Sequence, residues 1–225
     1  MASPQLILAS GSPRRQQFLR DLGLIFDVIV TDIDESVLPD ETPTELTSRL
    51  AQSKAQAVAN KLDSGLDPEH APAIIIAADT VVADGDEILG KPVDVTEAER
   101  MLTQLRGRVH EVHSGVSVLY TETDSQQTRV NTTSVWMRDY NDEELTAYIA
   151  SGDPMDKAGA YAIQHPTFAP AERVEGCISG VIGLPLGDLR ELLIAVVPIF
   201  DSIPSLVPVC EHYTGFDCCQ RAKKE

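Results

Sequence analysis

Apolar and polar residues alternate in blocks along the first 107 residues, and the spacing within each block predicts strands and helices in turn. The continuous apolar run Leu6–Ala9 is typical of a buried strand, and Phe26–Val30 predicts a second one. Between them, Phe18, Leu19 and Leu22 recur at helical spacing. This alternation predicts an α/β domain with a mixed, twisted sheet flanked by helices and a cleft between two lobes.

A long helix is predicted from Thr42 to about Leu62. Residues 42–45 form a capping box with proline at the first helical position, which is a strong start signal. Four residues spaced four or eight apart mark the apolar side of this helix: Leu46, Leu50, Val58 and Leu62. Lys54 interrupts that row. Its ammonium either extends past its apolar neighbours to solvent or points into a cleft, and a nearby phosphate site would favour the cleft.

The run Ile74–Ala78 is short and wholly apolar, which predicts a strand covered on both faces and ending at Asp79. The later elements predicted are a hairpin at Asp84-Gly85, a helix with the capping box Thr96–Glu99, an antiparallel pair at Val109–Tyr120 and Thr128–Met137, a helix from Asn141, and a closing helix at Leu189–Val197. Residues 1–200 are therefore predicted to form one domain, and residues 201–225 an irregular C-terminal tail.

The composition is that of a globular protein, but the charge balance is acidic. Eighteen Lys and Arg residues against 35 Asp and Glu residues leave a net charge of −17. This charge argues against general nucleic-acid binding and against an anionic membrane surface, because both need a basic footprint. No basic-then-apolar leader precedes Leu6 and no apolar run approaches the length of a membrane span, so we expect a cytoplasmic protein.

The cysteines and histidines give a weak metal signal. Three of the four cysteines, Cys210, Cys218 and Cys219, lie near His212, but their spacing fits no standard zinc pattern, so reduced thiols are expected. His110 and His113 are three residues apart on a predicted strand. Side chains at that spacing face opposite sides of a sheet, so the two histidines are not expected to share a metal.

The segment between the first strand and the first helix can form an anion site from local structure alone. Ser12 is a favoured N-cap and Pro13 a favoured first helical residue, so the helix is predicted to start there. Arg14 and Arg15 then lie in its first turn, where the helix dipole disfavours cations. A bound phosphate chain would explain both arginines, while a capped helix with two solvated arginines is the simpler interpretation.

Two carboxylates are candidates for the chemistry. Asp79 follows five apolar residues, which places it where α/β proteins bind ligands, although it could instead cap a turn with Thr80. Glu35 lies in an acidic loop after another strand and could equally be an exposed loop residue. Beside arginines and lysines, the pair would suit a magnesium- or manganese-assisted attack of water on a phosphate.

A set of five motifs in order resembles the Maf family of nucleoside triphosphate pyrophosphatases, from about Leu6 to Val197. The motifs are Ser10-Gly-Ser-Pro-Arg-Arg15, Ala78-Asp79-Thr80, Gly90-Lys91-Pro92, Arg108-Val-His110 and Gly159-Ala-Tyr-Ala-Ile-Gln164. The resemblance implies a Maf/Ham1-type fold, similar to inosine triphosphate pyrophosphatases, with a deep cleft. It also implies hydrolysis of a nucleoside triphosphate to the monophosphate and diphosphate, a divalent cation and a homodimer.

The resemblance assigns roles residue by residue. Asp79 matches the catalytic aspartate, and Glu35 its acidic partner, with both expected to hold the metal. The substrate-binding positions implied are Ser12, Arg14, Arg15, Lys54, Thr80, Lys91 and Gln164. The combination of Arg14, Thr80 and Gln164 resembles the subgroup acting on dTTP and UTP rather than on 7-methyl-GTP. Ala162 in place of glycine and the local loop His165–Glu172 depart from the family pattern near the expected base wall.

Two other functions remain open from the sequence. One is a pyrophosphatase for non-standard nucleotides such as ITP, XTP or 7-methyl-GTP. The other is a nucleotide-binding regulator of cell division with little turnover, although binding alone would not require both Asp79 and Glu35.

Overall fold

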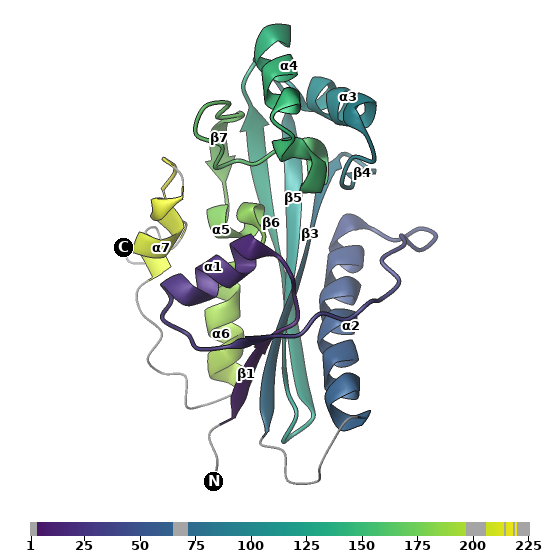
Figure 1. Cartoon of the computed structure of the whole chain (residues 1–225), viewed down its shortest axis with the longest axis vertical. Helices are drawn as coiled ribbons and strands as arrows, with labels where there is room; N and C mark the ends of the chain where they lie inside the picture. The colour runs from purple at the N-terminus through teal and green to yellow at the C-terminus, as the bar shows by residue number, and fades with distance from the viewer. Residues whose placement is uncertain (1–3, 65–71, 197–205, 214, 218, 220–225) are drawn as a thin grey trace.

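The computed structural model describes residues 4–64, 72–196, 206–213, 215–217 and 219. In this part of the chain, seven strands form one mixed sheet in the order β2-β1-β3-β5-β6-β7, with β4 paired to β3 (Figure 1). The strands are β1 (Gln5–Leu8), β2 (Asp27–Val28), β3 (Ala73–Asp84), β4 (Glu87–Leu89), β5 (Val109–Tyr120), β6 (Ser125–Met137) and β7 (Ala171–Glu175). The predicted mixed α/β sheet is confirmed.

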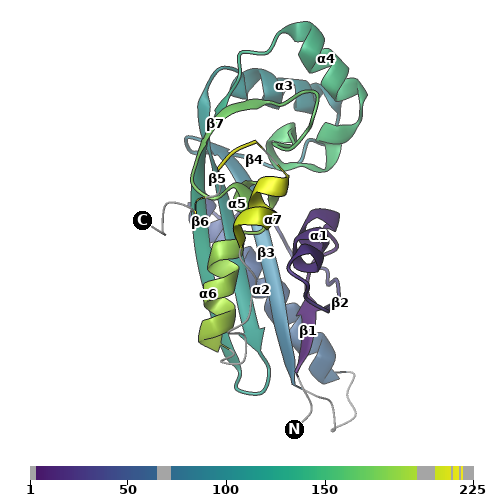
Figure 2. The ribbon, with the colours of Figure 1, turned by 90° about the vertical axis from the view of Figure 1, so that its left-hand side faces the viewer.

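Helices cover both faces of this sheet (Figures 1 and 2). The helices are α1 (Pro13–Asp21), α2 (Pro43–Ser64), α3 (Val95–Leu105), α4 (Asp142–Ala150), α5 (Ile178–Ile182), α6 (Leu186–Val196) and α7 (Leu206–His212). One cluster joins Ala55 and Val58 of α2 to Ile75 of β3. Phe18 of α1 and Leu189 of α6 belong to a second cluster with Ile76. Alternate residues of β3 thus pack against different helices, as the period of two in a strand requires.

The helix starts follow the predicted caps in two cases and differ in a third. The capping boxes at Thr42 and Asn141 form as predicted. The helix expected to start at the Thr96–Glu99 box instead begins at Val95, with Asp94 as the N-cap. The Asp94 carboxylate accepts a hydrogen bond from Glu97 N at 2.8 Å. Asp94 and Glu97 have the same three-residue spacing as the predicted pair Thr96 and Glu99, so they can form the cap two residues earlier.

Strand β3 continues past Asp79. It pairs with β5 from Ile74 to Ala83, and this long ladder carries the strand beyond its first apolar run. On the other edge of β3, the register with β1 ends at Ile76 and that with β4 begins at Val82. The prediction that Asp79 ends the strand is therefore wrong. Asp79 instead lies in the gap between these two short partner strands, where neither β1 nor β4 pairs with β3.

Helix α2 approaches the sheet very closely at Gly115 of β5. A Cβ atom built on Gly115 would lie 2.4 Å from the carbonyl oxygen of Thr47 in α2. Because the contact is with backbone, a larger residue would force the helix away from the sheet. This close approach sets the height of α2, and therefore of Lys54, above the sheet.

The glycine- and proline-rich stretch and the tail contain structure that the pattern did not predict. Strand β7 pairs with β6, and α5 follows it. The closing helix begins three residues earlier than expected, at Leu186, and Val197 lies outside the described residues. The tail is not wholly irregular, because α7 buries Leu206 and Cys210 and the Tyr213 ring meets the Phe18 ring edge-on. Cys218 also lies outside the described residues.

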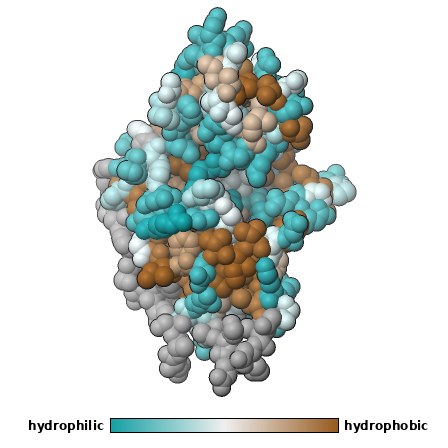
Figure 3. Space-filling model, viewed as in Figure 1, coloured by the Kyte–Doolittle hydropathy of each residue, from teal (hydrophilic) through white to brown (hydrophobic). Residues whose placement is uncertain are grey.

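One face of the molecule carries an apolar patch. Figure 3 shows these apolar side chains gathered below the middle of that face, whereas polar ones dominate its upper part. Residues in and beside the edge strand β2 are exposed and apolar, among them Ile25, Val28 and Val30. No helix within the described ranges is both long enough and apolar enough to cross a membrane.

Candidate active site

All nine residues predicted to act on substrate or metal line one cavity of about 650 Å³. They are Ser12, Arg14, Arg15, Glu35, Lys54, Asp79, Thr80, Lys91 and Gln164. They come from the β1–α1 loop, the first turn of α1, the β2–α2 loop, α2, the gap in β3, and the segments after β4 and α4. The structure thus brings together residues up to 152 positions apart in the chain (Ser12 to Gln164). Their individual roles, and a deep cleft between two lobes, stay predictions.

Lys54 links the two predicted carboxylates. Its Nζ lies 2.6 Å from Asp79 Oδ1 and 2.8 Å from Glu35 Oε1. The side chains of Lys54 and Asp79 are 14% and 10% exposed, whereas that of Glu35 is 57% exposed. The lysine on the apolar row of α2 therefore points into the cavity, which decides between the two interpretations of its position. It also compensates the buried charge of Asp79, which would otherwise be costly.

The same carboxylates fit a divalent cation. Both converge on one positive charge, the Lys54 ammonium, which shows that their oxygens can face a shared cation. Carboxylate oxygens are the donors that Mg²⁺ and Mn²⁺ prefer. Within the described residues, no group of three or more His, Cys, Asp and Glu side chains could hold a metal by itself. A site of one or two carboxylates completed by substrate phosphates and water is the usual arrangement for Mg²⁺.

Arg15 is held on the opposite face of β3 from Asp79. Its Nε donates to the Gly183 carbonyl at 2.8 Å and its Nη1 to Ser10 Oγ at 3.1 Å. Thr80 Oγ1 lies 3.5 Å from Arg15 Nη2 and 2.9 Å from Ser114 Oγ. Because adjacent strand residues face opposite sides, the side chains of Thr80 and Asp79 point to different faces of β3. The Thr80 hydroxyl belongs to the network that orients Arg15.

The electrostatic environment of Arg15 favours an anion. Burial lowers the pKa of Arg15, while the charge of Asp79 acts in the opposite direction. An arginine side chain is ionised throughout the physiological range even with a lowered pKa. The hydrogen-bond partners of this half-buried guanidinium are neutral oxygens, so its charge is only partly compensated, and a phosphate group would complete the compensation.

The first turn of α1 has the geometry of an anion site. Ser12 occupies the N-cap position and Pro13 the first turn, as predicted, but the Ser12 side chain makes no capping hydrogen bond. The backbone N–H groups of this turn are therefore not satisfied by that side chain. Arg14 Nη1 lies 3.8 Å from Asp156 Oδ2 across the cavity. The structure thus connects the α1 start to the segment that contains Gln164.

Lys91 and Gln164 line the cavity, and neither side chain forms a hydrogen bond or ion pair with another described residue. Both are therefore available to a ligand.

Residues 5–196 match the family described as Maf-like protein. The chain belongs to the Maf family. It is 42% identical over 189 residues to the dTTP/UTP pyrophosphatase of Acetivibrio thermocellus, covering 84% of this chain and 94% of that protein. It is 43% identical over 192 residues to the dTTP/UTP pyrophosphatase of Geotalea uraniireducens, covering 85% and 95%. The enzyme of that name from Vibrio vulnificus is 43% identical over 189 residues, covering 84% and 97%.

The Maf-like region contains site residues that the sequence reasoning missed. Lys157 is a buried residue of the cavity lining, and its Nζ contacts Asp156 Oδ1 at 2.6 Å and Asp153 Oδ1 at 3.0 Å. Lys157 lies two residues before the Gly159–Gln164 motif, and a lysine directly after Asp156 was the sequence signal that could have identified it. Ser114 and Gly183 reach the site only through pairing of distant segments, and no local signal marks them.

His110 and His113 face opposite sides of the sheet, as predicted. His110 Nε2 lies 2.7 Å from the hydroxyl of Tyr161, a residue of the cavity wall, whereas His113 Nδ1 lies 3.0 Å from Thr132 Oγ1. The Nδ1 atom of His110 is buried without a partner among the described residues. Burial lowers the pKa of His110 to about 4, so this Maf protein holds the imidazole neutral at neutral pH.

Replacing His110 is expected to reduce the acid sensitivity of folding. The folded-state pKa of His110 is about 4, against about 6.5 in the unfolded chain. Between these values the unfolded state binds more protons, so stability falls as pH drops from 6.5 towards 4. The slope from one proton is about 1.4 kcal/mol per pH unit. Urea unfolding between pH 4.5 and 7 measures the free energy of unfolding. In His110→Gln this free energy should fall less steeply with decreasing pH than in wild type, because the contribution of one proton is missing.

Tyr161→Phe is the control for this measurement. It removes the hydroxyl partner but keeps His110, so it should lower stability at every pH while keeping the slope. Parallel stability curves for wild type and His110→Gln would contradict the prediction.

Proposed function

We propose that this protein is a nucleoside triphosphate pyrophosphatase that hydrolyses dTTP and UTP to the monophosphate and diphosphate. The observation that carries the proposal is the convergence of Glu35 and Asp79 on Lys54 in a cavity that also holds Arg14, Arg15 and Lys91. A carboxylate pair beside several fixed cations suits the cleavage of a phosphoanhydride, whose developing negative charge must be neutralised. The names of the relatives support the same activity.

The positions of the three charged residues in the cavity suggest a separate role for each. Asp79, the more buried carboxylate, orients the attacking water and accepts its proton, whereas the more exposed Glu35 acts mainly as a metal ligand. When bound to these two carboxylates, Mg²⁺ or Mn²⁺ would neutralise charge on the phosphate oxygens. Lys54 keeps both carboxylates directed to one point.

The phosphate chain is bound at the start of α1. The N–H groups after Ser12, the guanidinium groups of Arg14 and Arg15, and the ammonium of Lys91 supply donors and positive charge to it. We assign Thr80 to holding Arg15, because its hydroxyl is already engaged with Ser114.

Gln164 is the residue we assign to the base. Uracil and thymine present the same O2, N3 and O4 edge, and the amide of Gln164 offers both donors and an acceptor to it. Because a methyl is worth only about 1–3 kcal/mol in a pocket, dTTP and UTP should be used similarly. CTP should be poorer, since its amino group and N3 invert the pattern and leave a buried polar group unpaired.

A nucleotide panel tests the proposal. dTTP, UTP, CTP, GTP, ITP, XTP and 7-methyl-GTP are supplied at equal concentration, and monophosphate and diphosphate are quantified by ion-exchange chromatography. We expect dTTP and UTP to be the preferred substrates, and Gln164→Glu to change the ranking. A purine preference would overturn the substrate assignment, and binding without turnover would favour a regulator. The homodimer and the cytoplasmic location stay predictions.

A further inference from the structure

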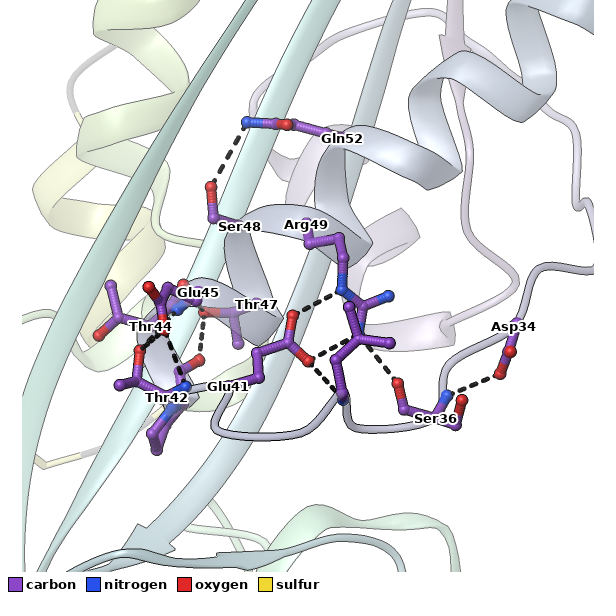
Figure 4. A network of polar contacts seen from close by, with 12 residues as sticks. Asp34, Ser36, Glu41, Thr42, Thr44, Glu45, Thr47, Ser48, Arg49 and Gln52 are labelled. Carbon is purple, nitrogen blue, oxygen red and sulfur yellow. Dashed lines mark hydrogen bonds and ion pairs between the residues drawn. The ribbon is translucent and has the colours of Figure 1, made fainter.

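The β2–α2 loop, residues 29–42, presents Glu35 to the cavity without support from a strand or helix. The Glu35 side chain is 57% exposed, so packing does little to fix it. A carboxylate that must meet Asp79 at a common point therefore needs its backbone held by polar contacts. Figure 4 shows where these contacts come from.

Arg49 of α2 binds the loop at the residue next to Glu35. Its Nη2 donates to the carbonyl oxygen of Ser36 at 2.9 Å. The same guanidinium forms a two-point pair with Glu41, from Nε to Oε1 at 2.6 Å and from Nη2 to Oε2 at 2.8 Å (Figure 4). Arg49 is not one of the residues that line the cavity, so these contacts are separate from any ligand.

Through Glu41, the pair also binds a second residue of the loop. Glu41 Oε2 accepts a hydrogen bond from the backbone N–H of Leu38 at 3.0 Å, and the Glu41 side chain is 7% exposed. The hydrogen bond from Arg49 lowers the pKa of Glu41, which keeps the pair ionised at neutral pH. The Asp34 carboxylate also accepts from Ser36 N at 2.9 Å, closing a turn around Glu35.

Helix α2 thus holds two neighbouring loop residues with two cations. Lys54 binds the carboxylate of Glu35 inside the cavity, and Arg49 binds the carbonyl of Ser36 outside it. Only the second contact persists if a divalent cation takes over the carboxylate of Glu35. The position of Glu35 would then depend on Arg49.

We propose that Arg49, paired with Glu41, is a positioning residue that sets the affinity of the Glu35–Asp79 pair for a divalent cation. This inference rests on the proposed function, because it assumes that Glu35 is a metal ligand. It differs from a purely structural role for the Arg49–Glu41 pair, which would change stability but not metal binding. Supporting groups of this kind typically change metal affinity by 10–100-fold.

The test is Mn²⁺ binding to the full chain, followed by electron paramagnetic resonance of the free ion, without nucleotide. Arg49→Lys keeps the charge but cannot make the two-point pair and the carbonyl contact together. We expect its Mn²⁺ dissociation constant to rise about tenfold, with Glu41→Gln changing in the same direction. Adding Arg49→Lys to Glu35→Gln should cause no further loss, because Arg49 acts through Glu35.

Arg138→Lys is the matched control. Arg138 also pairs with a glutamate, Glu144 at 2.9 Å, and binds the loop carbonyls of Ala169 and Phe168. Unlike Ser36, however, neither of these residues neighbours one that lines the cavity. The Mn²⁺ dissociation constant of Arg138→Lys should stay within twofold of the wild-type value. Thermal unfolding of every variant separates lost binding from lost folding.

Mn²⁺ affinity within twofold of wild type in both Arg49→Lys and Glu41→Gln would overturn the inference. So would an additive loss of affinity when Arg49→Lys is added to Glu35→Gln. Wild type that hydrolyses dTTP but binds no Mn²⁺ would also overturn it, while leaving the proposed activity intact. Conversely, wild type without hydrolysis of any nucleotide would overturn the proposed function, whereas the Mn²⁺ shift in Arg49→Lys would still support this inference.

Discussion

Asp79→Asn is expected to lower kcat by about a hundredfold or more, with nucleotide binding retained. The substitution removes a charge at a buried position in the gap of β3 and hardly changes the size of the side chain. Lys54 Nζ lies 2.6 Å from Asp79 Oδ1, and an asparagine oxygen at this position can still accept its hydrogen bond, so the fold should survive. It cannot accept a proton from water, and loss of a general base costs about 10²–10⁴-fold. A hundredfold loss corresponds to about 2.7 kcal/mol in the activation free energy.

Asp84→Asn provides a matched control on the same strand. The Asp84 side chain is 11% exposed and pairs with Arg108 at 3.1 Å, but it does not line the cavity. Its kcat should stay within about twofold of wild type. Steady-state rates with dTTP measure turnover, and titration calorimetry measures nucleotide binding. Near-normal turnover in Asp79→Asn would remove this residue from the mechanism.

Removal of divalent cations is expected to abolish turnover, and Mg²⁺ or Mn²⁺ should restore it. The site sets two carboxylates, Glu35 and Asp79, against the single ammonium of Lys54 before any phosphate arrives. A triphosphate adds several negative charges, which repel these carboxylates unless a further cation lies between them. Hard oxygen donors favour Mg²⁺ and Mn²⁺ over Zn²⁺, so zinc should restore less.

The experiment treats the protein with EDTA, removes the chelator by gel filtration, and measures dTTP hydrolysis before and after adding each ion. Circular dichroism of the treated protein is the control. The fold should remain intact without the metal, because Lys54 pairs with both Glu35 and Asp79 and compensates their charge. Full activity after exhaustive chelation would refute metal assistance.

Local sequence signals predicted those elements whose stability is local. The capping boxes at Thr42 and Asn141, and the proline at the start of α1, mark helix starts through contacts within three or four residues. Strand β5 was predicted at its observed bounds, because valines recur along its whole length and it ends on Leu119 and Tyr120. Strand β7 was missed because it carries alternating charges and is stabilised by pairing with β6.

The candidate site divides in the same way. The sequence by itself determined which residue types could perform the chemistry, since the Ser10–Arg15 loop, Asp79 and Lys54 stood out by local pattern, and the resemblance to the Maf family added Gln164. Only the tertiary structure decided their geometry. Pairing with β5 carries β3 past Asp79, and the short partners β1 and β4 leave its edge open there. Lys54 and Arg49 then bind consecutive loop residues, Glu35 and Ser36. These contacts join segments distant in the chain, and their positions depend on backbone hydrogen bonds and close packing that no local pattern encodes.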